Sequence, residues 1–249
     1  MILRRVTKLL GLAVVMVFFA IASPVLAQSL SLDLGGGEPS ATGRIVQIIA
    51  LLTILSIAPS ILVMVTAFTR IVVVLSFLRN AMGVQQTPPN AVLISLALFL
   101  TAFVMAPTLE QSYRDGIAPL MENRINEEEA FKRTVQPVHK FMMTHVREQD
   151  LRLFLDIAKS PPTETGVDTP LRSLIPAFMI SELRRAFEIG FLLFVPFLII
   201  DMVVASVLMS MGMMMLPPVM ISLPFKLIFF VLVDGWYLVA GSLIQSYGG

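Results

Sequence analysis

Five charged side chains stand inside otherwise apolar stretches of this sequence, at Arg70, Glu188, Asp201, Lys226 and Asp234. An ionisable group within an apolar helix is costly to bury, so such a residue is usually functional or paired. One interpretation is a path for protons or other ions. The alternative is structural pairing across helices or subunits, which the near balance of 18 basic and 17 acidic residues favours. We expect buried charge pairing.

A second unusual stretch reads MSMGMMMLPP and carries Met209, Met211, Met213, Met214 and Met215 just before two prolines. This spacing is not the i, i+3, i+4 stripe of ordinary helix packing. Methionine has a soft, unbranched side chain that adapts to irregular shapes. Repeated around an axis, such loops would form a compliant apolar ring that seals against water and ions yet yields to a passing polypeptide. Ordinary core filling is the alternative interpretation.

No motif for an enzyme, a nucleotide site or an acidic metal cluster is recognisable in the sequence. His139 and His145 are not spaced i, i+4, so they would not share one helix face as metal ligands. The chain has no cysteine, which excludes disulfides and thiolate metal sites. We therefore expect no catalytic residue, no metal and no cofactor.

The composition indicates a membrane protein. Hydrophobic residues make up 56% and charged residues 14%, against roughly 45–50% and about 25% in soluble domains. Most charges lie between residues 110 and 188, with apolar blocks on either side. A net charge of +1 without a basic run gives no reason to expect nucleic acid.

The amino-terminal 27 residues have the pattern of a cleaved secretory signal peptide. Arg4, Arg5 and Lys8 precede an apolar run, and Val25 and Ala27 mark a cleavage site. The alternative is an uncleaved first membrane helix, although the apolar run is short for one. Residues 28–43, which contain three consecutive glycines, read as a flexible tether.

Residues 44–109 are predicted to form a first helical hairpin. Its first span is Ile45 to Val65, followed by a helix that closes at Asn80 and Gly83. The turn with Pro88 and Pro89 then leads into a helix over 91–109.

The rest of the chain divides into a polar insert and a second hairpin. Residues 110–172 are predicted to form a small helical insert, with Glu127 to Glu129 heading a helix and a loop over 159–170. Residues 173–249 form the second hairpin, with the methionine-rich gate loop. Its first helix runs to Met215 with a kink at Pro196, and its second runs from about Pro224 to Ile244. The predicted fold class is an all-α membrane protein of long kinked helices in hairpins, with this insert outside the cytoplasm.

Three stretches resemble the FliP family of bacterial flagellar export-gate proteins. They are FTRIVVVLSFLRNAMGVQQTPPNAVLISLALFLTAFVMAP, PAFMISELRRAFEIGFLLFVPFLIIDMVVASVLMSMGMMMLPP and LPFKLIFFVLVDGWYLVAGSLIQS. The resemblance covers most of residues 60–247. It implies an inner-membrane subunit of the type III export apparatus within the flagellar basal body, with its insert facing the periplasm.

The resemblance also implies partners and site residues. The partners are other copies in a ring, a pentamer in the family, with FliQ and FliR type subunits, other export-apparatus proteins, unfolded exported proteins and membrane lipid. The methionines of the loop would form a gasket at the gate. Phe141, Phe154 and Glu182 match positions linked to ring formation. Glu182 stands beside Arg184 and Arg185, so it could bridge to a neighbour or satisfy its own chain.

We expect a non-catalytic gating subunit of a protein-conducting channel. Three alternatives are weighed against it: an injectisome counterpart, which would share the core motifs; a proton-coupled transporter, which would use Asp201, Glu188 and Asp234; and an intramembrane enzyme. The signal peptide favours the flagellar branch.

Overall fold

The structure is a computed structural model that describes residues 41–84, 86–159, 169–213 and 216–248. The predicted signal peptide and residues 28–40 of the predicted tether lie outside these ranges. Residues 41–43 of the predicted tether belong to a helix instead. In the described ranges the chain forms helices and no strand, which confirms the all-α prediction.

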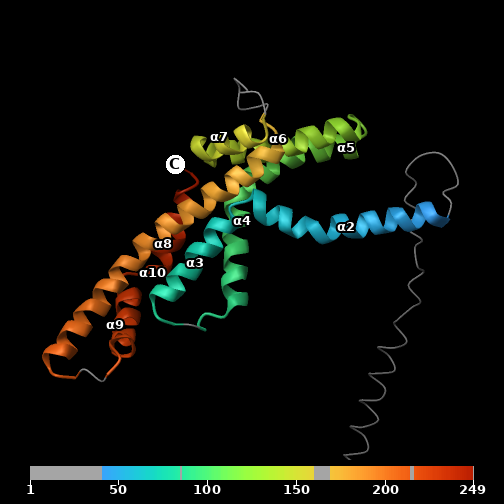
Figure 1. Cartoon of the computed structure of the whole chain (residues 1–249). Coiled ribbons are helices and arrows are strands. Elements are labelled where there is room, and N and C mark those ends of the chain that lie inside the picture. The colour runs from blue at the N-terminus through green and yellow to red at the C-terminus, as the bar shows by residue number, and fades with distance from the viewer. Residues whose placement is uncertain (1–40, 85, 160–168, 214–215, 249) are drawn as a thin grey trace, which may run out of the picture. The chain divides into compact units, whose positions relative to one another are not determined.

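The helical elements follow one another along the chain as Figure 1 shows. They are α2 (Ala41–Val65), α3 (Phe68–Ala81), α4 (Asn90–Ser112), the π-helical turn η1 (Tyr113–Ile117), α5 (Ala118–Met121), α6 (Glu127–His145), α7 (Glu148–Ile157), α8 (Leu171–Ser210), α9 (Pro218–Leu232) and α10 (Gly235–Gln245).

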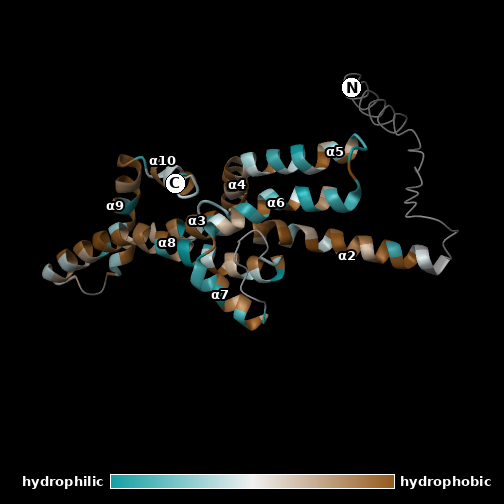
Figure 2. Cartoon of the chain, turned by 90° about the horizontal axis from the view of Figure 1, so that it is seen from above, coloured by the Kyte–Doolittle hydropathy of each residue, from teal (hydrophilic) through white to brown (hydrophobic). Residues whose placement is uncertain are grey.

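Three helical segments are long and apolar enough to cross a membrane: Ile45–Val65, Asn90–Met121 and Leu171–Ser210. Helices α9 and α10 would form a fourth if their 63° bend is one broken span. Figure 2 shows the apolar character of α2, α4, α8 and α9 against the polar α6. A helical membrane protein is therefore confirmed.

Helices α3 and α4 form the predicted hairpin. Gly83 ends α3 with a φ of 79°, and its N–H donates to the Asn80 carbonyl at 3.0 Å. The Arg79 guanidinium crosses the turn and donates to Asn90 Oδ1 at 2.5 Å and to the Pro88 carbonyl at 3.3 Å. The turn is thus fixed by side-chain contacts as well as by its prolines.

The polar insert begins later than predicted. The helix that starts at Asn90 continues through η1 to Met121, so residue 110 lies inside it. The polar residues from position 110 onward do not end this helix. The chain turns only after Met121. Helix α6 begins where the acidic triplet predicts, because Asn126 Oδ1 accepts from the Glu129 N–H at 2.9 Å. Lys132 and Arg133 pair with Glu128 and Glu129 one turn away.

Helix α8 runs for 40 residues, continuously through Pro176 and Pro196. It ends at Ser210, before the predicted Met215, because Gly212 adopts a φ of 74°. The Gly212 N–H donates to the Met209 carbonyl at 3.1 Å and the Met213 N–H to the Leu208 carbonyl at 3.0 Å. This is a Schellman closure, which satisfies the last carbonyls of the helix.

The predicted single helix from Pro224 to Ile244 is two helices. Helix α9 starts at Pro218, and the chain breaks at Asp234, whose φ of 51° is left-handed. At the next residue, Gly235, an added Cβ would lie 2.1 Å from the Phe230 ring, so only glycine fits. An Asp-Gly pair is a turn signal, and it overrides the apolar run on both sides.

The core is centred on α3. Ile71, Val74 and Leu78 are fully or almost fully buried, facing Leu174 and Phe178 of α8 and Leu93 and Ala97 of α4. Helices α3 and α8 approach closely at Gly190, where an added Cβ would lie 2.6 Å from the Phe77 ring. The two helices are therefore fixed in register at this point.

Gly190→Ala should destabilise the protein by about 1–3 kcal/mol, because the added methyl group overpacks the Phe77 contact. Gly241→Ala is the matched control, since nothing lies within 4 Å of a Cβ added there. The melting temperature of the protein in detergent measures both variants. Equal melting temperatures would contradict the close approach of α3 and α8.

Candidate functional site

A buried ion pair joins α3 to α8. The Arg70 guanidinium donates through Nε to Glu182 Oε2 at 2.9 Å and through Nη2 to Glu182 Oε1. Both side chains are 0% exposed. Two parallel bonds between guanidinium and carboxylate combine strength with a fixed geometry, so this pair sets how the two helices face each other.

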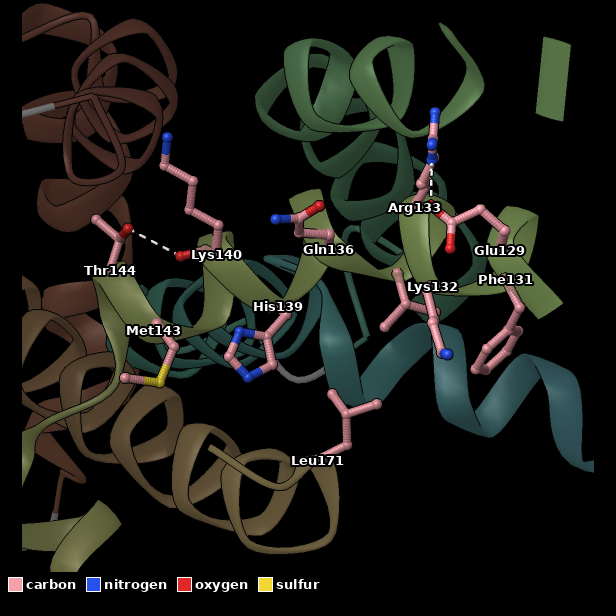
Figure 3. Close-up of a pocket in the computed structure, with 11 residues that line it drawn as sticks. Glu129, Phe131, Lys132, Arg133, Gln136, His139, Lys140, Met143, Thr144 and Leu171 are labelled. Atoms are coloured by element: carbon pink, nitrogen blue, oxygen red, sulfur yellow. Dashed lines mark hydrogen bonds and ion pairs between the residues drawn. The ribbon is translucent and has the colours of Figure 1, made fainter. Parts of the chain in front are cut away.

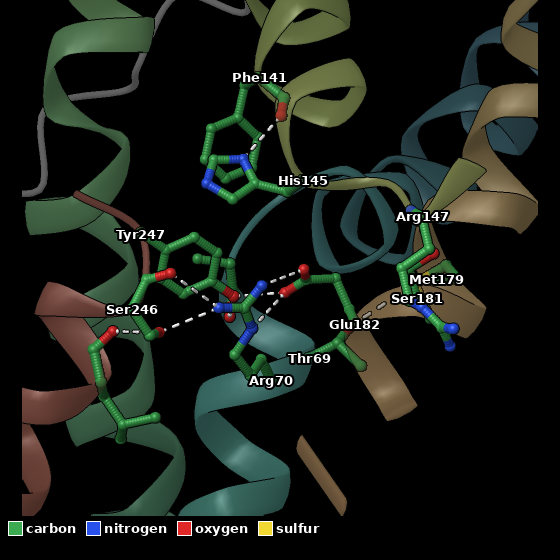
Figure 4. Close-up of polar contacts among 12 residues, drawn as sticks. Thr69, Arg70, Phe141, His145, Arg147, Met179, Ser181, Glu182, Ser246 and Tyr247 are labelled. Atoms are coloured by element: carbon green, nitrogen blue, oxygen red, sulfur yellow. Dashed lines mark hydrogen bonds and ion pairs between the residues drawn. The ribbon is translucent and has the colours of Figure 1, made fainter. Parts of the chain in front are cut away.

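The segment that follows α10 completes this cluster. Tyr247 donates its hydroxyl to Glu182 Oε2, and the Arg70 guanidinium carbon lies 3.8 Å from the centre of the Tyr247 ring. Arg70 Nη1 donates to Ser246 Oγ at 2.9 Å. Burial and the adjacent Glu182 carboxylate raise the pKa of Tyr247, which keeps its hydroxyl protonated as a donor. Figure 4 shows these four side chains pointing toward one another.

Helix α6 of the insert contacts the same cluster through an aromatic group. The Phe141 ring lies 5.9 Å from the rings of Phe178 and Tyr247 and 4.6 Å from His145. His145 Nδ1 lies 2.8 Å from the Phe141 carbonyl, and only an Nδ1–H can donate there. The ion pair is therefore covered by the insert.

A second ion pair, between a buried lysine and a half-buried aspartate, joins α8 to α9. Lys226 Nζ lies 2.6 Å from Asp201 Oδ2 and donates to the Ala81 carbonyl, at the end of α3, at 3.2 Å. Ser222 donates to Asp201 Oδ1 at 2.5 Å. Three helices thus meet at one lysine, whose side chain is 4% exposed.

The charges singled out in the sequence have different surroundings. Arg70 and Lys226 are buried and paired, and Asp201, the partner of Lys226, is half-buried. Glu188 is 59% exposed and pairs with Arg184 on its own helix. Asp234 is exposed in the left-handed turn. Glu188 and Asp234 are therefore not buried within the single chain, and their pairing with another subunit stays a prediction.

The predicted interface residues divide in the same way. Glu182 is fully buried and satisfies its own chain, and Phe141 is 9% exposed. Both side chains face the interior of the single chain, and their role in ring formation stays a prediction. Phe154, on α7, is half-buried and retains accessible surface.

The methionine loop lies at the tip of the α8–α9 hairpin (Figure 1). Met209, Met211 and Met213 are 60%, 66% and 43% exposed, so they do not fill the core of the chain. Met214 and Met215 lie outside the described residues.

A groove of about 890 Å³ follows α6 and reaches Leu171 at the start of α8. Figure 3 shows His139 and Met143 on the side of the groove that faces α8. His139 Nε2 lies 2.8 Å from the Thr169 carbonyl, so this histidine is engaged by backbone. Among the described residues, no group of three or more His, Cys, Asp or Glu side chains could hold a metal ion.

The sequence did not reveal Ser246 and Tyr247 as members of the ion-pair cluster. The available signal was that Arg70 needs a buried partner and that a tyrosine and a serine follow the last apolar helix. Neither identifies a contact between residues 176 positions apart, such as that between Arg70 and Ser246.

Glu182→Gln should destabilise the protein by about 3–5 kcal/mol, because it leaves the Arg70 charge buried without a counter-charge. Glu188→Gln is the matched control on the same helix: it removes an exposed pair worth about 0–1 kcal/mol. Thermal unfolding in detergent compares the two. Equal losses of stability in the two variants would show that the buried pair contributes no more than the exposed one.

Together these features define an all-α membrane protein whose long helices are joined by ion pairs. The FliP family model matches residues 51–243. Three relatives carry the name flagellar biosynthetic protein FliP. The one from Caulobacter vibrioides is 59% identical, covering 98% of this chain and 92% of its own. Those from Bacillus subtilis and Aquifex aeolicus are 56% and 50% identical, covering 84% and 90% of this chain and 95% and 94% of theirs. The chain belongs to the FliP family, as its sequence motifs predict.

Proposed function

We propose that this chain is a subunit of the flagellar type III protein export apparatus and that several copies form its protein-conducting channel. The observation that carries this proposal is the uncharged loop of exposed methionines at the tip of the α8–α9 hairpin, in a member of the FliP family. The relatives are named as flagellar proteins, which does not favour the injectisome alternative.

The methionine side chains of this loop are suited to closing a channel reversibly. Thioether side chains from several copies would make many contacts, each worth about 0.1–0.2 kcal/mol per atom pair, so the closure is reversible. A narrow apolar constriction also excludes water and ions by dewetting, without a charged plug. The Lys226–Asp201 pair holds α9 against α8 and thereby fixes where the loop projects.

The exposed surface of the hairpin supports assembly with other apolar surfaces. Phe191, Leu192 and Met202 of α8 are 65–68% exposed, and Met220 and Val231 of α9 are 70% and 75% exposed. Such a surface requires lipid or protein partners. We propose further copies of the chain, in a pentamer as the family resemblance implies, together with FliQ and FliR type subunits and other export-apparatus proteins.

The proposed location is the bacterial inner membrane, with a signal peptide removed and the α6–α7 insert on the periplasmic side. Unfolded flagellar proteins would be the cargo. A proton path along Asp201, Glu188 and Asp234 has less support, because Asp201 is paired with Lys226 and Glu188 with Arg184.

Shortening Met213, Met214 and Met215 together to Ala should leave the complex assembled and make the resting channel leaky to ions. Truncating a buried core methionine would instead cost about 2–5 kcal/mol and lower the yield of complex. Conductance in planar bilayers and the yield of complex are measured on the same preparation.

The control for this experiment is Met121→Ala, at a methionine of α5 that is 70% exposed and far from the loop in sequence. It should change neither conductance nor yield. An intact triple variant that conducts no more than the wild type would refute the gasket.

Phe154→Ala should reduce ring assembly while leaving a folded monomer, because this half-buried ring has surface left for a neighbour. Truncating a central interface residue costs about 2 kcal/mol or more. Leu153→Ala, at a 51% exposed neighbour on α7, is the control. Native mass spectrometry counts the subunits; unchanged rings in the Phe154 variant would exclude this interface.

A further inference from the structure

A small cleft lies beside the Arg70–Glu182 cluster and has no role in the proposed gate. Its volume is about 380 Å³, and it is lined by Arg70, Arg147, Arg185, Glu188, Ile189 and Ser246. Ligand pockets typically measure roughly 300–1,000 Å³, so this cleft could hold a small polar group.

The charges around the cleft do not balance. Glu182 neutralises Arg70, and Glu188 binds Arg184, which does not line the cleft. Within the described residues, Arg147 and Arg185 form no ion pair with an acidic side chain. Two uncompensated guanidinium groups therefore face one small space, and together they attract an anion.

Hydrogen bonds hold the backbone of Arg147 in place beside the cleft. Its N–H donates to Ser181 Oγ at 3.0 Å, and Ser181 donates to Asp150 Oδ2 at 2.7 Å, so its backbone is fixed against α8. Arg147 Nη1 is buried and has no hydrogen-bond partner among the described residues. A buried donor without an acceptor is unfavourable, and a bound anion would supply the missing acceptor.

The position of the cleft, next to an apolar segment of α8, indicates what kind of anion would bind there. It lies at the point where α8 becomes apolar, since residues 189–200 carry no charge. Arg185, Ile189 and Leu192 are spaced i, i+4 and i+7, so they share one face of the helix. Leu192 is 68% exposed. An apolar stripe thus leads away from the basic cleft along the same helix.

We propose that this cleft binds the phosphate of an anionic phospholipid, with Arg147 and Arg185 as its ligands and an acyl chain along Ile189 and Leu192. Guanidinium groups bind phosphate oxygens bidentately, and basic pockets beside membrane helices suit anionic headgroups. This site is independent of the methionine loop, so it stands or fails separately from the gate.

The test uses the full chain in its oligomeric complex, purified in a neutral detergent. Phosphatidylglycerol or phosphatidylcholine is added, and bound lipid is counted by native mass spectrometry. The wild type should retain phosphatidylglycerol in preference to phosphatidylcholine. The double variant Arg147→Gln, Arg185→Gln should bind phosphatidylglycerol about tenfold more weakly, with the same oligomeric state. Arg114→Gln, at an arginine that is 73% exposed outside the cleft, should bind like the wild type.

A second variant, Leu192→Ser, separates a lipid from a free anion. It should weaken phosphatidylglycerol binding without changing the charge of the cleft, and excess inorganic phosphate should compete only partly with the lipid in the wild type. Equal retention of both lipids, equal binding by wild type and double variant, or complete displacement by phosphate would overturn the proposal. Loss of the oligomer in the double variant, with or without lipid, would also overturn it and assign the two arginines to a partner's carboxylate.

Discussion

The structure depends on a single buried contact between opposite charges, the Arg70–Glu182 pair. Two fully desolvated charges are tolerated only where good geometry and further hydrogen bonds offset the loss of water. Here Tyr247 and Ser246 supply those bonds, and Phe141 and Phe178 provide an apolar cover. Because these residues come from four separate parts of the chain, the electrostatic requirement of one pair determines the arrangement of α3, α6, α8 and the segment after α10.

The second pair, Lys226–Asp201, repeats this arrangement about 28 Å further along α8, at ~1.5 Å per residue. That spacing is close to the hydrocarbon thickness of a bilayer, about 30 Å. Between the two pairs, α8 carries the Arg184–Glu188 pair, Arg185 and otherwise apolar side chains, many of them exposed. The polar contacts thus hold the two ends of the helix within the chain, while its middle is left to external partners.

The sequence was sufficient for the features that arise from local or periodic signals. Hydropathy indicated the three long apolar segments, the acidic triplet Glu127–Glu129 indicated the start of α6, and Pro88 and Pro89 indicated the turn of the first hairpin. It was insufficient where a long-range contact or one backbone angle decides. Nothing local distinguishes Glu182, which is buried, from Glu188, which is exposed one and a half turns later. The left-handed angles of Gly212 and Asp234 ended helices that the apolar pattern continues. Tyr247 joined the cluster because tertiary packing brings it to Arg70.

The close approach at Gly190 has a mechanical consequence. With the Phe77 ring against the backbone of α8 and the Arg70–Glu182 pair two turns away, α3 and α8 cannot slide past each other and form a rigid strut. From Glu182 to Ser210 this strut extends about 42 Å at ~1.5 Å per residue. A tilt of about 5° at the ion pair would therefore displace its far end by about 4 Å, by simple leverage over that helical length. A small movement of the insert would therefore be amplified along α8 into a larger displacement of the methionines at its far end.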